Sequence, residues 1–413
     1  MKDVVFVSAV RTPVGSYMGT LKDVEAYDLA ALVLNEVIKR AGVTPDMVDE
    51  VIMGQAYQNG EYVNIARMAL LNANWPESIP AFTLDQRCCT GIEVMRLAKA
   101  LIQTGQAEII VAGGVESMSN AEFYLPGDIK WGVGGKNGMP RGHGDLSIWG
   151  LRFYDRIQRA RVMSQPIHRY GVLPTMMSWA DRGANEEGVT REECDQWSLG
   201  SHQKAIAAID NGTFKDEIVP VTIPQRKGDP IVFDTDETPR RTTTIEQLRK
   251  LKPVLGGVST AGNSSSENDG AAAVLMMSAD KAKELGLEPY AKLVEVAVAG
   301  EDPERAYRTV PAAVNELFKK TGLSINDLDL IEIQEAFSAQ VLADLKMLNI
   351  GEDKYNIINV NGSGISLGHP IACTGVRVMV TLLHEMKRRN AKKAMEVICG
   401  GGGLGIAAII ERS

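Results

Sequence analysis

The sequence predicts an α/β protein made of two similar halves that flank one long insertion. Two observations support this prediction: short patterns near the two ends of the chain recur in the same order, and strand-like and helix-like segments alternate around them. The 413-residue length also exceeds what one hydrophobic core usually serves, and 45% hydrophobic residues supply ample apolar side chains. Each half is therefore expected to be a modest α/β unit.

Three patterns carry the repeat, and their copies stand at a nearly constant separation of about 280 residues. They are Gly42–Asp49 with Gly322–Asp329, Cys89–Met95 with Cys373–Met379, and Ala112–Gly114 with Cys399–Gly401. A single match would be coincidence more often than not. Three matches in order indicate a duplicated domain.

The N-terminal half is expected to cover residues 1–120 plus about 258–284, and the C-terminal half residues 285–413. In the first half, strands are expected at 3–10, 50–53 and 109–111, because these runs are short and apolar. Residues 27–41 and 92–104 have the spacing of amphipathic helices. Such alternation favours parallel or mixed sheets covered by helices, packed about a pseudo-twofold axis.

The insertion, residues 121–257, has glycine-rich stretches and a helical pattern at 191–209, and we expect it to cover the site. Basic residues gather in it against the acidic trend of the chain: Arg226, Lys227, Arg240, Arg241, Arg249, Lys250 and Lys252. A phosphorylated ligand would suit them. Taken alone, such a cluster is more often a solvated surface.

The composition argues against several classes of protein. A net charge of −8 opposes a nucleic-acid surface, so the expected partner is a small molecule. No leader precedes the first strand and no apolar run approaches the ~20 residues of a membrane helix, so we expect a cytoplasmic protein without membrane contact. The five cysteines lack paired spacing and the histidines lack ligand spacing, so we expect reduced thiols and no metal.

Cys88 follows an apolar strand and precedes a helix, so it is a candidate nucleophile. A thiol at a helix N-terminus feels the positive end of the helix dipole, which favours the thiolate. The adjacent Cys88 and Cys89 would equally fit a pair of buried structural thiols. This segment alone leaves both interpretations open.

Three further segments add chemistry. His369 follows the glycine-rich loop 359–368 and is placed to take a proton from a cysteine; a Rossmann phosphate loop fits this spacing less well. Cys399 ends a short strand before four glycines, whose free N–H groups would suit an oxyanion hole. Gln334 and Glu335 stand where another strand ends, a usual position for ligand contacts.

Together these segments resemble the thiolase family across the whole chain. The matching motifs are Cys88-Cys89-Thr90-Gly91, Gln334-Glu335-Ala336-Phe337, Gly368-His369-Pro370 and Cys399-Gly400-Gly401, in family order. The resemblance implies a five-layered αβαβα core of duplicated halves with an inserted loop domain. It also implies reversible Claisen condensation and thiolysis of 3-oxoacyl-CoA, with acyl-CoA and CoA as substrates, no separate cofactor, and a homotetramer formed as a dimer of dimers.

The resemblance further implies the roles of individual residues. Cys88 would take the acyl group, His369 would activate it, and Cys399 would move the α-proton of the second acyl-CoA. The N–H groups of Cys88 and Gly401 would hold the acyl oxyanion, and Gln334 would orient a water. By matching position, the expected substrate-binding residues are Arg240, Ser265, Met176, Ala336 and Phe337.

Three departures from the family pattern keep alternatives open: Gln334 replaces the common asparagine, Cys89 adjoins the nucleophile, and the segment before Met176 is unusually aromatic, with Trp131, Trp149, Phe153, Tyr154 and Tyr170. An acetyl-CoA C-acetyltransferase is the first expectation. A thiolase for a longer or branched acyl chain is the second. The third is a non-catalytic acyl-CoA-binding protein that keeps the fold, which only Gln334 favours.

Overall fold

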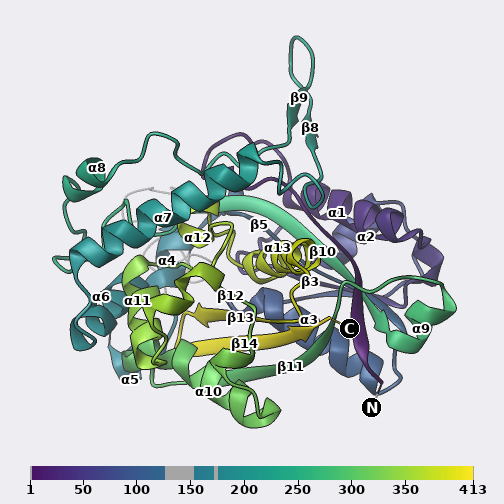
Figure 1. Ribbon diagram of the computed structural model, residues 1–413. Coiled ribbons are helices and arrows are strands. Elements are labelled where there is room, and N and C mark those ends of the chain that lie inside the picture. Colours follow the sequence, from purple (N-terminus) through teal and green to yellow (C-terminus); the bar gives the residue numbers. More distant parts are fainter. Residues whose placement is uncertain (1, 126–152, 172–174, 413) are drawn as a thin grey trace.

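The computed structural model describes residues 2–125, 153–171 and 175–412. Nine long strands lie side by side in the order β12-β13-β14-β11-β1-β10-β5-β3-β4, and the short β2 (Gly15–Ser16) pairs with β10. Figure 1 shows this sheet running through the molecule, with helices on both of its faces. The predicted α/β class is confirmed.

The sheet consists of two half-sheets with the same strand plan. The N-terminal one has β1 (Val4–Arg11), β10 (Asn268–Ser278), β5 (Ile109–Ser117), β3 (Glu50–Gly54) and β4 (Ala81–Leu84). The C-terminal one has β11 (Ala291–Gly300), β14 (Leu404–Glu411), β13 (Lys393–Gly400) and β12 (Leu330–Ile333). In each, the first two pairings are antiparallel and the next is parallel. A short β1–β11 pairing joins them.

Alternate residues of the strands face different helical layers. In β1, Val5 and Val7 pack in the cluster that contains α1, whereas Val4 and Phe6 pack in the cluster that contains α3 and α13. The five layers are α1 (Ala26–Ala41) with α2 (Ile65–Asn72), one half-sheet, α3 (Thr90–Gln103) with α13 (Thr374–Arg389), the other half-sheet, and α10 (Thr309–Thr321) with α11 (Ser338–Met347). This is the predicted αβαβα arrangement.

The first repeated pattern has a local explanation. Gly42 and Gly322 end α1 and α10 in left-handed backbone conformations, which glycine adopts at little cost. Each is followed by a short 3-10 helix, η1 (Pro45–Met47) or η6 (Ile325–Asp327), and then by a strand. The two copies therefore encode the same turn from an outer helix into the sheet.

The second repeated pattern lies at the centre of the molecule. A Cβ atom on Gly91 of α3 would lie 2.5 Å from the Val376 backbone nitrogen and 2.6 Å from the Gly375 Cα of α13. Conversely, a Cβ on Gly375 would lie 2.7 Å from the Ile92 nitrogen. The two helices thus cross backbone against backbone, which only glycine permits on both sides.

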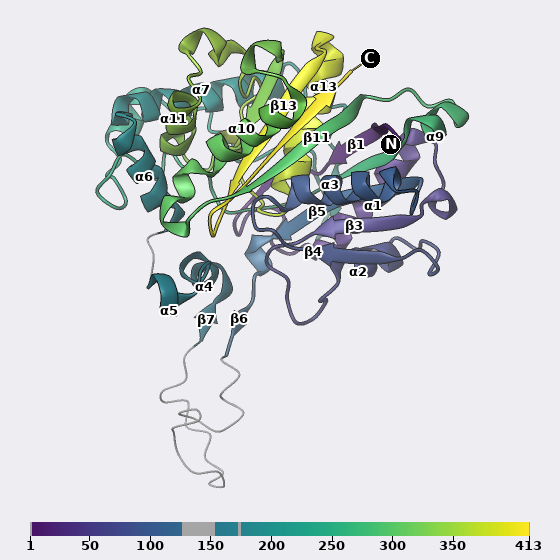
Figure 2. The same ribbon diagram turned by 90° about the horizontal axis from the view of Figure 1, so that it is seen from below.

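The insertion forms smaller elements outside the sheet. They are β6 (Phe123–Tyr124), β7 (Tyr154–Asp155), α4 (Arg156–Val162), α5 (Ile167–Tyr170), α6 (Met176–Glu186), α7 (Arg191–Asp210), β8 (Val221–Ile223), β9 (Ile231–Phe233) and α8 (Ile245–Arg249). Figure 1 shows α7 crossing above α12 (Gly364–Leu367) and the β8–β9 hairpin projecting from the body. Figure 2 shows β6, β7, α4 and α5 together on another side.

The remaining short helix α9 (Ala279–Glu284) connects β10 to β11, and the 3-10 helices η2 (Met118–Asn120), η5 (Pro303–Arg308) and η7 (Glu352–Ile357) lie in connections. Across the described ranges, no helix has the length and apolar character needed to cross a bilayer.

The helix crossing leads to a stability prediction. We expect Gly91→Ala to lower the free energy of unfolding by about 1–3 kcal/mol, because its methyl group would overlap the backbone of α13. Urea unfolding of the two proteins measures this difference. Gly200→Ala in α7 is the matched control, since a Cβ there meets no atom within 4 Å and alanine favours helix. Equal stabilities for the Gly91 variant and the wild type would contradict the tight crossing.

Candidate active site

The motif residues meet at one end of the sheet. Cys88 follows β4, Gln334 follows β12, and Cys399 is the second-to-last residue of β13. All three therefore lie near the carboxyl ends of parallel strands. His369 follows α12 and the positive-φ residue Gly368. Open α/β sheets place their ligands at such strand ends.

Cys88 and His369, which are 281 residues apart in the chain, are hydrogen-bonding partners: the distance from Sγ to Nε2 is 3.2 Å. The turn that carries Cys88 is braced by Thr90, whose hydroxyl accepts from the Gln86 N–H at 2.7 Å and donates to the Arg87 carbonyl at 2.6 Å. Arg87 has a positive φ, so the turn is tight. Thiol and imidazole are thus held in reach for proton transfer.

The hydrogen bonds around His369 select its tautomer. The Thr374 hydroxyl donates to the Pro370 carbonyl oxygen at 3.1 Å, and its oxygen lies 2.7 Å from His369 Nδ1. With its proton used in this way, the hydroxyl accepts from Nδ1–H. The lone pair of Nε2 then faces the Cys88 thiol, as a general base requires.

Both partners are neutral in the resting site. Burial raises the pKa of the Cys88 thiol to about 11, although the charge of Arg87 and the backbone N–H groups of Gly401 and Cys88 act in the opposite direction. Burial, and then the charge of Arg377, lower the pKa of His369 to about 3. Burial thus favours a neutral Cys88 thiol at rest, whereas the positive end of the helix dipole would act in the opposite direction; α3 begins at Thr90, two residues after Cys88.

Cys399 is buried and lines a pocket together with Met176 and Phe337. Burial, followed by the charges of Cys88 and Asp344, raises the pKa of its thiol well above the usual value. The backbone N–H of Gly401, two residues further on, acts to lower the pKa of the Cys88 thiol, so the segment that follows β13 lies close to Cys88. This N–H is suitably placed for an oxyanion that forms at Cys88.

Cys89 has a different environment from Cys88. It is fully buried in the central layer, and its Sγ lies 3.8 Å from the Ile398 carbonyl oxygen. A Cβ on Gly400 would lie 2.8 Å from this sulfur. Cys89 therefore packs between α3 and β13, as a small apolar side chain would.

Gln334 is buried, and neither polar atom of its side-chain amide has a hydrogen-bond partner among the described residues. Its Nε2 lies against the loop that leads to His369. A Cβ atom added to Gly364 of this loop would be only 2.5 Å from Nε2. A buried amide without partners is costly, so a water or ligand atom is expected to complete it. This agrees with the water-orienting role inferred for Gln334.

Glu335 joins the insertion to the catalytic loop. Its Oε1 accepts from Trp197 Nε1 at 2.9 Å and Asn359 Nδ2 at 3.1 Å, and its Oε2 accepts from the Ser201 hydroxyl at 2.7 Å and the Ile365 N–H at 3.2 Å. Trp197 and Ser201 belong to α7. One buried carboxylate thus ties α7 to the segment that leads to His369.

The segment of Ser265 runs beside the same loop. Ser265 N–H donates to the Ala336 carbonyl oxygen at 2.9 Å, and Ser264 forms a bridge with Phe337. A little further on, Asn268 Oδ1 accepts from the His369 N–H at 2.9 Å. The predicted substrate-binding residues Ser265, Ala336 and Phe337 therefore lie together next to the reacting groups.

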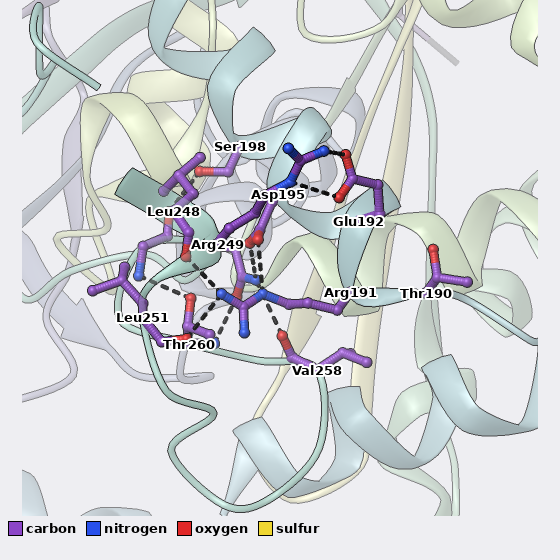
Figure 3. Close-up of polar contacts among 12 residues, drawn as sticks. Thr190, Arg191, Glu192, Asp195, Ser198, Leu248, Arg249, Leu251, Val258 and Thr260 are labelled. Carbon is purple, nitrogen blue, oxygen red and sulfur yellow. Dashed lines mark hydrogen bonds and ion pairs between the residues drawn. The ribbon is translucent and has the colours of Figure 1, made fainter. Parts of the chain in front are cut away.

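Arg240 lies apart from these groups, exposed on the loop after β9, and its backbone N–H donates to His202 Nδ1 at 3.3 Å. The surrounding insertion is held by ion pairs. Arg191 Nη2 donates to the carbonyl oxygens of Leu248 at 2.6 Å and Leu251 at 3.0 Å, as Figure 3 shows, and its Nε donates to Asp195 at 2.8 Å. Asp195 also accepts from Asn263, which precedes the Ser265 segment.

The basic cluster of the insertion is thereby divided. Arg249 pairs with Glu192 (Figure 3) and Arg241 pairs with Asp210, so these two guanidinium groups stabilise the insertion itself. Arg240 remains exposed, as do Arg226, Lys227, Lys250 and Lys252.

The aromatic residues before Met176 have different surroundings. Phe153 is exposed, Tyr154 packs against Tyr124, and Tyr170 packs with Trp179 and Tyr307. Trp131 and Trp149 lie outside the described residues. Among the aromatic residues of this set that the structure describes, Tyr170 is the one that packs against the wall of the pocket containing Cys399.

Several residues that organise the site carry no sequence motif of their own. Glu116 at the end of β5 accepts from the N–H groups of Ala56, Tyr57 and Ala372 at 3.0–3.1 Å, which ties the His369 loop to the N-terminal half. Burial raises its pKa to about 7. Thr374 and Asn268 act on His369 directly. Of these residues, Thr374 had a signal in the sequence, because the repeated Cys-Thr-Gly pattern aligns it with Thr90.

No group of three His, Cys, Asp or Glu side chains within 2–125, 153–171 and 175–412 is arranged to bind a metal ion. The chemistry these residues can perform is proton transfer and nucleophilic attack by two thiols and an imidazole.

Comparison with known families gives two matches that together span nearly the whole chain. Residues 4–280 match the model of the thiolase N-terminal domain, and residues 287–412 match that of the thiolase C-terminal domain.

Curated relatives match over their full length. An acetyl-CoA acetyltransferase of Syntrophomonas wolfei is 44% identical, with 99% of each chain covered, and one of Pseudomonas aeruginosa is 44% identical with both chains fully covered. Among solved structures, the Bacillus anthracis acetyl-CoA acetyltransferase has a TM-score of 0.90 at 41% identity, covering 100% of this chain and 99% of that one. Human mitochondrial 3-ketoacyl-CoA thiolase has a TM-score of 0.89 at 35% identity, with the same coverage.

The hydrogen bond to Thr374 can be tested by removing its hydroxyl. We expect Thr374→Val to lower kcat by about 10- to 100-fold, because His369 would lose the acceptor that fixes its tautomer. Thr374→Ser keeps the hydroxyl and should retain most of the activity. A steady-state assay of the three proteins across pH provides the measurement. A fully active valine variant would contradict the assignment.

The neutral resting state predicts a pH dependence. Since burial raises the pKa of Cys88 to about 11 and lowers that of His369 to about 3, alkylation of Cys88 by iodoacetamide should keep accelerating from about pH 7 to pH 10. A free cysteine peptide should level off above its pKa of about 8.5. Peptide mass spectrometry locates the modification. A plateau near neutral pH would reveal a thiolate–imidazolium pair instead.

Proposed function

This chain belongs to the thiolase family, and from that premise we propose that it is an acetyl-CoA C-acetyltransferase that condenses two acetyl-CoA molecules and cleaves the product in reverse. The observation that carries the proposal is the 3.2 Å contact between Cys88 and His369 at a centre that Cys399 and Gly401 also reach. Transfer of an acyl group by this family's chemistry needs such a set of groups.

The first half-reaction is acylation of Cys88. His369 Nε2 takes the thiol proton, and the sulfur attacks the thioester carbonyl of acetyl-CoA. The tetrahedral intermediate collapses, the carbon–sulfur bond to CoA breaks, and the departing CoA thiolate takes the proton of Cys399. The enzyme then holds an acetyl group on Cys88, an imidazolium at His369 and a thiolate at Cys399.

The second half-reaction forms the carbon–carbon bond. The Cys399 thiolate removes an α-proton from a second acetyl-CoA, and the resulting carbanion attacks the acetyl carbonyl on Cys88. The Cys88 sulfur leaves and takes the proton from His369, which restores both resting groups. The sum is two acetyl-CoA to acetoacetyl-CoA and CoA, and each proton is accounted for.

Two groups of donors would stabilise the negative charge. The N–H groups of Cys88 and Gly401 are directed toward the Cys88 sulfur, close to the oxygen of its acyl group. A water held by the unpartnered amide of Gln334, together with His369, would serve the thioester oxygen of the second substrate. Glutamine can supply this contact because Gly364 leaves its amide room in the loop.

CoA binding is proposed for the insertion side of the site. Ser265 lies beside Ala336, where the pantetheine would pass, and the exposed Arg240 is suited to the nucleotide phosphates. The two thiols and the imidazole supply every proton transfer, so we propose that no cofactor takes part other than CoA as substrate and product.

A short acyl group fits the pocket around Cys399 best. Met176, Phe337, Trp179 and Tyr307 all lie on its wall, and Trp179 and Tyr307 belong to one buried cluster. Large aromatic side chains here leave little depth for a longer chain. This supports acetyl transfer over a longer or branched substrate.

The assembly, compartment and pathway are also part of the proposal. The resemblance of the chain to its family over its whole length supports a homotetramer formed as a dimer of dimers, acting in the cytoplasm in fatty acid metabolism. Size-exclusion chromatography with light scattering would test the assembly.

A turnover assay separates the proposed enzyme from a non-catalytic acyl-CoA-binding protein. We expect the enzyme to consume acetoacetyl-CoA when CoA is added, and the 3-oxoacyl absorbance should therefore fall. A panel of longer and 2-methyl 3-oxoacyl-CoA substrates should give lower kcat/KM, because Trp179 and Tyr307 limit the pocket. Binding without turnover of any member would favour the alternative.

The division of labour between the thiols predicts two distinct defects. Cys88→Ala should abolish the acyl-enzyme detected by mass spectrometry after mixing with acetyl-CoA. Cys399→Ala should still acylate Cys88 but should not condense, because the base for the α-proton is missing. Equal loss of acylation in both variants would refute these roles.

A further inference from the structure

The pocket beside Cys399 is apolar except at one side. Its wall is formed by side chains of α6, η5, α10 and α11 and by the end of β13: Met176, Trp179, Ala180, Ala306, Tyr307, Thr309, Val310, Phe337, Gln340, Asp344 and Cys399. Gln340 and Asp344 stand one turn apart on α11, so both point to the same side. Both residues line the same pocket as Cys399.

Asp344 is a buried carboxyl group with one satisfied oxygen. Gln340 Nε2 donates to its Oδ2, whereas Asp344 Oδ1 and Gln340 Oε1 have no hydrogen-bond partner among the described residues. Asp344 is 1% exposed. Two buried acceptors without partners on one pocket wall call for a proton donor.

The apolar surroundings of Asp344 favour its protonated form. The other titratable groups on the pocket wall are Cys399 of β13 and Tyr307 of η5, and the Tyr307 hydroxyl is engaged with Glu186 of α6. The wall residues of α10 and α11 bring no charge other than Asp344, and no cation is on the wall. Burial raises the pKa of Asp344 well above its usual value, with only the Gln340 hydrogen bond acting against it.

We propose that Asp344 is a positioning residue whose neutral carboxyl group donates a hydrogen bond through one bridging water to the Cys399 sulfur. Gln340 holds the carboxyl group by its amide N–H and accepts from the same water. This assignment rests on the proposed function, in which Cys399 alternates between thiol and thiolate during each turnover.

The protonation state decides the effect. An ionised Asp344 would repel a thiolate at Cys399 in this low-dielectric pocket, and so would suppress the base. A neutral carboxylic acid instead stabilises the thiolate as a donor, a use of a buried, protonated carboxyl group that enzymes make for developing anions. If position 344 served packing alone, leucine would fit this apolar wall better than aspartate, because burying a polar group costs free energy.

The experiment separates the two half-reactions in the full-length protein. Acylation of Cys88 is followed by mass spectrometry after rapid quenching, and proton removal by Cys399 is followed as deuterium uptake from D2O into the methyl group of acetyl-CoA. Both rates are measured across pH for the wild type, Asp344→Asn and Asp344→Leu. Asparagine keeps a neutral donor of the same shape, whereas leucine keeps only the volume.

We expect Asp344→Leu to slow deuterium uptake by about 10- to 100-fold and to shift its pH profile to higher pH, because a hydrogen bond to a charged group is lost. Its acylation rate should change far less. Asp344→Asn should restore uptake to within about threefold of the wild type, as a donor predicts. The matched control is Glu396→Gln. Glu396 is a buried carboxyl group in β13, the strand of Cys399, and its side chain points to the opposite face of the sheet from Cys399. This variant should leave the pH profile of uptake in place.

Three results would overturn the assignment. One is normal uptake in Asp344→Leu. Another is a defect in Asp344→Asn as large as that of the leucine variant, which would mean that ionisation is required. The third is a parallel loss of acylation and uptake, which would indicate a structural role. Failure of the wild type to acylate or to take up deuterium would instead overturn the proposed function, so the two failures remain distinct.

Discussion

The backbone contact between α3 and α13 is the constraint on which the site depends. Gly91 and Gly375 let the two helices approach until main-chain atoms touch, and this crossing lies in the layer shared by both half-sheets. The turn with Cys88 precedes one helix and the loop with His369 precedes the other. A wider crossing would separate a sulfur and a nitrogen that now lie 3.2 Å apart.

Around this crossing, buried carboxyl groups hold the loops in position. Glu335 accepts four hydrogen bonds and Glu116 accepts three, so the cost of burying each is offset by donors from segments distant in sequence. The reacting groups themselves are uncharged at rest, because desolvation dominates their pKa values. The site is therefore organised by fixed hydrogen bonds and acquires charge only as the reaction proceeds.

Much of this could be predicted from the sequence, because the duplicated patterns and the four motifs are local. The repeated patterns predicted the duplicated α/β halves, and the resemblance carried by the motifs implied the αβαβα layers and the meeting of Cys88 and His369. The raised pKa of Cys88 could not be predicted, since the burial that causes it depends on the packing of the whole chain. Asn268 and Asp344 were missed for a related reason: their importance lies in contacts across long stretches of chain. The basic cluster was only partly interpretable, because ion pairs to Asp210 and Glu192 occupy two of its arginines.

The two threonines of the repeated Cys-Thr-Gly pattern have an evolutionary consequence. Thr90 and Thr374 occupy equivalent places at the starts of α3 and α13, yet one braces the turn of the nucleophile and the other orients the base. An ancestral unit that paired with its own copy would have carried two identical hydroxyl groups facing a symmetric cleft. In the present chain the two hydroxyl groups have different partners, so one repeated position serves two different tasks.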